Sequence, residues 1–236
     1  MVYLSEFVGA LIFLVGGYAY MCNVTLKKTL IGKLNYIELT VAWSLAVGFA
    51  LTVAVIMGGP ALLNPGAVLG NLIIGSITAK EALLFLLMEF AGAGAAVLIV
   101  MIFFFDSFKE SEDGQFRGIF SAYPVKKNLC LNFIQEVLAT FFFLFLVLVT
   151  IKATSEPIVI GIVGFAAVAI LALTLNSTGF SMNAMRSFFS SIWYAILPIP
   201  NKKDKVDWVY QIVVNLVAST IGGACATIVA SLINFG

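Results

Sequence analysis

Apolar residues in this chain fall into long runs that alternate with short polar segments. The runs cover about residues 7–26, 39–57, 90–105, 137–151, 157–177 and 208–235. The third run extends back toward Glu81 and the fourth toward Leu131. Because a helix needs about 20 apolar residues to cross a hydrocarbon core of roughly 30 Å, the pattern predicts six membrane-spanning helices.

Two shorter apolar stretches, at 64–75 and 183–197, each follow a turn-like segment and are too short to cross a membrane. They are either interfacial loops or half-helices that enter the membrane inside surrounding protein. An internal repeat favours half-helices, since residues 5–10 are echoed at 135–140 and each copy is followed by two more spans. Three spans per repeat is an odd number, so the halves have opposite orientations and the functional site is expected where the broken helices meet.

Composition excludes several classes of protein. Hydrophobic residues make up 61% of the chain and charged residues 11%, whereas soluble domains carry about a quarter charged residues. There is no histidine, which removes the usual general base and the commonest metal ligand. A net charge of +1 and three scattered cysteines give neither a nucleic-acid footprint nor a metal-ligand spacing. We therefore expect no enzyme, no metal, no cofactor and no nucleic-acid partner.

Asparagines begin both short stretches. Asn64 suits the N-cap of a helix and Pro65 its first position, while Asn183 is followed by Ala184. Two half-helices that meet at mid-membrane would direct their positive dipole ends at one point. That point would repel cations and leave the asparagine amides free to donate to a passing oxygen.

Charged residues within the apolar segments are candidates for function, because they are costly at membrane depth. Arg186 lies three residues after Asn183 in a segment otherwise free of charge. Glu6, Glu89 and Glu136 could form a proton or cation relay, or could accept hydrogen bonds from the backbone of re-entrant loops. The repeat-related positions of Glu6 and Glu136 favour loop support, whereas Glu89 has no repeat partner.

Four segments carry a resemblance to a known family. Residues 63–66 (LNPG) and 178–186 (TGFSMNAMR) resemble the two Asn-Pro-Ala boxes of the aquaporin and glycerol-facilitator family, the major intrinsic proteins. Residues 118–124 (GIFSAYP) resemble the stretch before the fourth span of glycerol-facilitating members, and 24–28 (VTLKK) the end of their first span. The resemblance implies an all-α membrane protein: a right-handed bundle of six transmembrane helices with two re-entrant half-helices.

The resemblance also implies the organisation and surroundings of the protein. We expect a single channel domain over residues 1–236, with repeats at 1–105 and 131–236 and a connecting loop at 106–130. It would be a multi-pass protein of the plasma membrane, usually a homotetramer, with its N-terminus in the cytoplasm. Its partners would be the lipid bilayer and small neutral solutes such as glycerol and water.

Residue roles follow from the same resemblance. The pore centre would be formed by the two boxes, Asn64-Pro65-Gly66 and Asn183-Ala184-Met185. Phe180 and Arg186 would belong to an outer constriction, with Trp43 as the facing aromatic residue and Leu171 where glycerol channels have glycine. Trp43 lies about one residue from the expected spacing, which corresponds to roughly 100° around a helix.

Departures from the family pattern leave the solute open. Gly66, Ala184 and Met185 replace box residues, and Ser187 stands where an aspartate often follows the arginine. The leading hypothesis is a passive channel for glycerol, related polyols and water. Three alternatives are a water-selective channel narrowed by Met185 and Leu171, a proton-coupled secondary transporter using an intramembrane glutamate, and a closed structural membrane protein.

Orientation is the one point on which charge and resemblance disagree. With the N-terminus inside, ten basic residues would lie outside and only Lys80 and Lys152 in inner loops. The ten are Lys27, Lys28, Lys33, Lys109, Arg117, Lys126, Lys127, Lys202, Lys203 and Lys205. The positive-inside rule would choose the reverse, but we expect the orientation of the family.

Overall fold

The computed structural model describes residues 1–234, and the regular secondary structure of this part of the chain is entirely helical, without a strand. Six helices are long and apolar enough to cross a membrane, as the sequence predicted. They are α1 (Val2–Thr25), α2 (Tyr36–Ile56), α4 (Ala79–Phe103), α7 (Leu129–Ala153), α8 (Pro157–Thr174) and a last helix over Trp208–Ser231. The last helix begins as α10 (Trp208–Tyr210), passes through the π-helical segment η2 (Gln211–Ala218) and ends as α11 (Ser219–Ser231).

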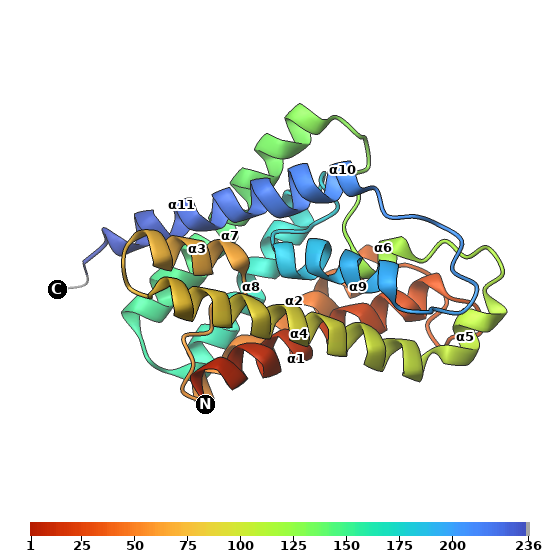
Figure 1. The fold of residues 1–236 in the computed structure, drawn as a ribbon, viewed down its shortest axis with the longest axis horizontal. Helices are drawn as coiled ribbons and strands as arrows, with labels where there is room; N and C mark the ends of the chain where they lie inside the picture. Colours follow the sequence, from red (N-terminus) through yellow and green to blue (C-terminus); the bar gives the residue numbers. More distant parts are fainter. Residues whose placement is uncertain (235–236) are drawn as a thin grey trace.

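Two short helices occupy the two stretches for which the sequence allowed either a loop or a half-helix. The first is α3 (Pro65–Ile73). The second begins with the π-helical turn η1 (Met185–Phe189) and continues as α9 (Ser190–Ile196). Figure 1 shows α3 and α9 running along the long axis of the molecule, one toward each end. The half-helix interpretation therefore holds for both stretches.

Helix contacts place each half-helix against the other half of the chain. In the first half α1 packs against α2 and α4, and in the second half α7 packs against α8 and α11. The two halves meet where α2 packs against α8. The first half-helix, α3, packs against α11 and the second, η1 with α9, packs against α4. Each half-helix is thus enclosed by protein, which non-helical backbone at membrane depth requires.

Glycine residues allow close contacts between the backbones of these helices. A Cβ atom placed on Gly66 would lie 2.8 Å from Gly223 Cα of α11, and one on Gly92 would lie 2.7 Å from Ala10 Cβ of α1. Contacts of this kind let helix backbones approach in lipid, where van der Waals packing drives association. The first of them explains why glycine replaces alanine in the box at Asn64, because α3 and α11 leave no room for a methyl group.

Three polar loops gather at one end of the molecule. Lys28 pairs with Glu110 at 3.0 Å, the Arg117 N–H donates to Asp204 Oδ2 at 2.9 Å, and Lys127 pairs with Asp207. The short helices α5 (Phe105–Glu110) and α6 (Arg117–Phe120) belong to the same end (Figure 1). The loops that carry most of the basic residues therefore form one connected surface.

Candidate functional site

The two asparagines at the half-helix N-termini are bonded reciprocally. Asn64 Oδ1 accepts from the Gly66 N–H at 2.9 Å, and Asn183 Oδ1 accepts from the Met185 N–H at 2.9 Å. Asn64 Nδ2 donates to the Met182 carbonyl at 2.9 Å, and Asn183 Nδ2 donates to the Leu63 carbonyl at 2.7 Å. Each amide group has two N–H donors, so each asparagine keeps one for a molecule beside it.

The loops that lead to the asparagines share one unusual backbone conformation. Ala61 and Leu63 have φ of 50° and 41°, and Phe180 and Met182 have φ of 62° and 50°. These residues lie three and one positions before Asn64 and Asn183 respectively. Non-glycine residues with positive φ are uncommon and cost of order 1–3 kcal/mol each, and they persist only where their surroundings impose them.

Two buried carboxylates hold these loops. Glu6 on α1 accepts from the N–H groups of Leu62 at 2.9 Å and Leu63 at 2.7 Å. Glu136 on α7 accepts from the Met182 N–H at 2.6 Å. The carboxylates therefore satisfy backbone donors that the non-helical loops leave without helical partners.

Two neighbouring cavities lie in the protein, one of them beside the asparagines. The inner cavity has a volume of about 40 Å³ and is lined by Asn64 and Asn183 together with an apolar wall. The outer cavity has a volume of about 260 Å³. Trp43, Phe180 and Arg186 line both cavities. These three side chains, from α2, the second re-entrant loop and η1, therefore lie at the boundary between the two cavities, which we call the constriction.

Arg186 supplies the charge in this constriction. Its guanidinium carbon lies 4.6 Å from the centroid of the Trp43 ring, within the range of a cation–π interaction. The side chain is 5% exposed, and Nε has no hydrogen-bond partner among residues 1–234. Within that described range, no other charged side chain lines either cavity. The site can thus offer hydrogen-bond donors to a neutral molecule while its charge opposes cations.

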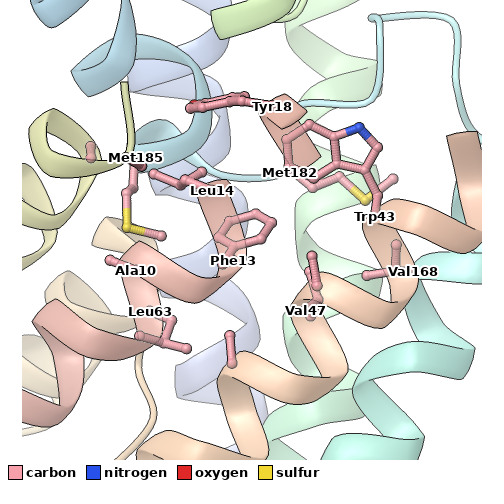
Figure 2. Close-up of a cluster of buried hydrophobic side chains, with 14 of the residues drawn as sticks. Ala10, Phe13, Leu14, Tyr18, Trp43, Val47, Leu63, Val168, Met182 and Met185 are labelled. Atoms are coloured by element: carbon pink, nitrogen blue, oxygen red, sulfur yellow. The ribbon is translucent and has the colours of Figure 1, made fainter. Parts of the chain in front are cut away.

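Met185 and Leu171 do not line either cavity, contrary to the expectation that they narrow the pore. Met185 follows Ala184 in the half-helix and is fully buried, and Figure 2 shows it near Ala10 and Leu14 of α1. Leu171 lies one turn beyond Val168, which does line the inner cavity. Because a helix has 3.6 residues per turn, the side chain of Leu171 points about 60° away from the direction of the Val168 side chain.

Met182 is one of the cavity residues that the sequence analysis did not predict. It lines the inner cavity, and Figure 2 shows its sulfur near Trp43. It precedes Asn183 as Leu63 precedes Asn64, and both residues line the cavity. The alignment of the two repeats was therefore the signal that could have found it. The apolar wall also includes Phe13, Val47 and Val168 from α1, α2 and α8, and four residues of α7, which are Phe143, Leu144, Val147 and Leu148.

Glu89 does not line the cavities, although it lies close to Glu6 and to the backbone N–H of Asn64. It is fully buried on α4, neither carboxyl oxygen has a hydrogen-bond partner within residues 1–234, and it lines neither cavity. A relay along the cavities would need a titratable group in contact with them, and Glu89 is not placed for that role.

Comparison with known proteins decides the family. The sequence profile described as "Major intrinsic protein" matches residues 2–230. The chain belongs to the major intrinsic protein family. Members of this family are membrane channels and not enzymes, which agrees with a chain of six apolar helices.

Individual relatives cover almost the whole chain. The "Glycerol uptake facilitator protein" of Streptococcus pneumoniae serotype 4 is 34% identical over 236 residues, which are 97% of each chain. The "D/L-lactic acid transporter" of Lactiplantibacillus plantarum is 32% identical over 227 residues, 94% of this chain and 93% of the relative. The aquaglyceroporin of Plasmodium falciparum has the same fold, with a TM-score of 0.79 at 20% identity over 96% of this chain and 93% of that one.

Proposed function

We propose that this protein is a passive channel for small neutral solutes, with glycerol and related polyols as its solutes together with water. The observation that carries the proposal is the constriction of Trp43, Phe180 and Arg186 between two cavities, next to paired asparagine donors. The names of relatives support glycerol, while one relative of similar identity is named for lactic acid.

The chemistry of the constriction suits a polyol. The second N–H of each asparagine amide has no partner in the described chain, and the Arg186 guanidinium has terminal N–H groups besides the one that Nη1 donates to Ser187. A hydroxyl oxygen accepts from such donors. The rings of Trp43 and Phe180 face the carbon side of the same molecule. Cations are repelled by the guanidinium and by the positive ends of the two half-helices.

Two of the alternatives lose support from the geometry. A channel narrowed to water by Met185 and Leu171 requires those side chains in the cavity wall, and they are not there. A proton-coupled transporter requires a titrating acid in the path, and no acidic side chain of the described residues lines the cavities. The closed structural protein is the alternative that flux measurements must exclude.

A coupling experiment tests the passive mechanism. Uptake of labelled glycerol into proteoliposomes is measured with and without an imposed pH gradient, and then with labelled lactic acid. Glycerol influx that exceeds that of empty liposomes, ignores the gradient and stops at equal concentrations would support a passive channel. Accumulation above the external concentration would contradict it, and faster lactic acid than glycerol influx would overturn the choice of solute.

The remaining organisation also belongs to this proposal. We infer two inverted repeats, 1–105 and 131–236, with the loop 106–130 between them. The matching φ angles before Asn64 and Asn183 support this division.

Exposed apolar side chains such as Phe49 and Ile162 suit lipid or neighbouring subunits. We place the protein in the plasma membrane as a homotetramer with a cytoplasmic N-terminus. A C-terminal tag that labels on intact cells would overturn that orientation, and a monomeric mass in mild detergent would overturn the tetramer.

A further inference from the structure

Ser187 occupies a hydrogen-bonding centre directly behind the constriction. Its side chain is fully buried in η1, next to Arg186. Ser187 Oγ accepts from Arg186 Nη1 at 3.0 Å and from the Ala122 N–H at 3.2 Å, and its own proton is left for the hydrogen bond with Ser181 Oγ at 2.7 Å. One hydroxyl therefore joins the guanidinium to two segments of backbone that line the cavities.

The partner segment at Ala122 is itself anchored. The Ala122 carbonyl accepts from Asn215 Nδ2 at 3.0 Å and from Gln211 Nε2 at 3.3 Å, both on η2. Ala122 also lines the outer cavity. The hydroxyl of Ser187 thus connects Arg186 to a fixed element and not to a free loop.

The backbone of Arg186 is held from the other side. The hydroxyl of Tyr18 on α1 donates to the Arg186 carbonyl at 2.5 Å and is also hydrogen-bonded to the Ser190 hydroxyl, with 2.6 Å between the two oxygens. These bonds fix where the side chain of Arg186 starts, but they do not fix the direction of the guanidinium. Of the polar groups around it, the Ser187 hydroxyl accepts from the guanidinium directly.

We propose that Ser187 is a positioning residue for solute selection, whose hydroxyl holds the Arg186 guanidinium over Trp43 and so sets the opening between the two cavities. The inference rests on the proposed function and assigns a role to a position where the family often has aspartate. A serine orients the guanidinium without neutralising it, because a hydroxyl accepts hydrogen bonds but carries no charge. The full positive charge of Arg186 therefore stays in the constriction.

The test compares the permeabilities of two polyols, glycerol and the larger xylitol, in the same proteoliposomes. A loss of folded channels lowers both permeabilities by one factor, so their ratio reports selection and not stability. Ser187→Ala removes the acceptor and is expected to raise the xylitol-to-glycerol ratio about three- to tenfold, the range expected for one lost hydrogen bond. Ser187→Thr keeps the hydroxyl and is expected to retain the ratio of the unmodified protein.

Two further variants keep the test decisive. Ser187→Cys preserves the shape of the side chain but offers only a weak acceptor, so it replaces Ser187→Ala if the alanine variant does not reach the membrane. Ser191→Ala is the matched control, because Ser191 is fully buried in α9 and its hydroxyl has no partner among residues 1–234. It is expected to leave the ratio unchanged.

The outcomes separate this inference from the function on which it rests. Glycerol flux through the unmodified protein together with an unchanged ratio in Ser187→Ala and Ser187→Cys would overturn the role of Ser187 alone. An equal shift in Ser191→Ala, or a threonine variant that behaves like alanine, would overturn it as well. No glycerol flux through the unmodified protein would remove the proposed function and this inference together.

Discussion

The guanidinium of Arg186 lies over the ring of Trp43, with 4.6 Å between the guanidinium carbon and the ring centroid. The two residues come from η1 and α2, in opposite halves of the chain. A cation–π contact of this kind contributes about 0.5–2 kcal/mol, more when it is desolvated. It places a charge and an apolar surface at one point between two cavities, which is what discrimination among small polar solutes needs.

Trp43 is predicted to limit the size of the solute. Trp43→Ala is expected to raise the xylitol-to-glycerol permeability ratio about tenfold or more, since contacts in a close-fitting site discriminate by at least that factor. Because such a truncation costs about 3–5 kcal/mol of stability, Trp43→Phe is measured beside it. Trp208→Ala is the control, as Trp208 is exposed and lines neither cavity. Equal ratios in Trp43→Ala and Trp208→Ala would contradict the assignment.

Asn64 and Asn183 are predicted to make coupled contributions to the free energy of unfolding. Asn64→Ala and Asn183→Ala each remove a helix cap, and each should lower the free energy of unfolding by about 0.5–2 kcal/mol. Because each side chain also holds the loop that precedes the other, the double variant should lose less than the sum of the single losses. Thermal unfolding in detergent measures all three.

Asn71→Ala is the matched control for that cycle. Asn71 lies near the other end of α3, and its amide donates only to the Ala67 carbonyl one turn away at 2.9 Å. The decrease in the free energy of unfolding caused by Asn71→Ala should simply add to the decrease caused by Asn183→Ala. Strict additivity of the Asn64 and Asn183 variants would show that the reciprocal bonds do not couple the two half-helices.

Glu89 is predicted to be dispensable for flux. Its carboxyl oxygens have no hydrogen-bond partner among the described residues, and burying such a group is costly. Glu89→Gln keeps the shape of the side chain, so glycerol flux should be unchanged and thermal stability equal or higher. Glu136→Gln provides the contrast, because Glu136 accepts from the Met182 N–H and its change should lower stability. Loss of flux in Glu89→Gln alone would revive the proton-coupled alternative.

Asp207 is predicted to make the stability of the polar end depend on pH. Burial alone would raise the pKa of Asp207, but hydrogen bonds from Lys127 and the Tyr210 N–H and the charges of Lys127 and Arg117 outweigh it, so the pKa lies below the ordinary 3.8. A carboxylate with a depressed pKa stabilises the fold above its unfolded-state pKa, and this stabilisation is lost as the pH falls through the folded-state value.

The expected size of this effect is small, because the pair is partly exposed. Asp207→Asn should lower the free energy of unfolding by about 1 kcal/mol or less at neutral pH. The difference should shrink as the pH falls below about 4 and should vanish only below the folded-state pKa of Asp207, which lies under 3.8. Thermal unfolding of both proteins across that range measures it. Asp106→Asn, at an exposed position of α5 and in no ion pair among the described residues, is measured as the control. A difference for Asp207→Asn that persists in acid would contradict the ion-pair explanation.

The sequence predicted the spans because hydropathy is a local property, whereas their ends depend on tertiary contacts. The first span was expected from residue 7, but α1 begins at Val2 and includes Ser5 and Glu6. Both are polar and fully buried, and Glu6 is bonded to the first re-entrant loop. No apolar pattern could place a helix there, since the partner of Glu6 lies 56 residues away along the chain.

The residues of the site also fall into those that the sequence could predict and those that depend on tertiary contacts. Helix-capping rules found Asn64 and Asn183, and the repeat pointed to Glu6 and Glu136, because each of these signals lies in the residue type and its position. The choice between Met182 and Met185 depended on the direction of side chains in a loop with positive φ at Phe180 and Met182. That conformation is imposed by the bonds to Glu136 and Asn64, which a single segment of sequence does not reveal.

Stopped-flow light scattering on proteoliposomes tests the central claim most directly. An external step in sucrose concentration first measures how fast the vesicles shrink as water leaves. An external step in glycerol concentration then measures shrinkage followed by re-swelling as glycerol enters. A glycerol channel is expected to give fast shrinkage and fast re-swelling, both well above the rates of empty liposomes. Fast shrinkage with slow re-swelling would contradict a glycerol channel in favour of a water channel, and rates equal to those of empty liposomes would contradict an open channel.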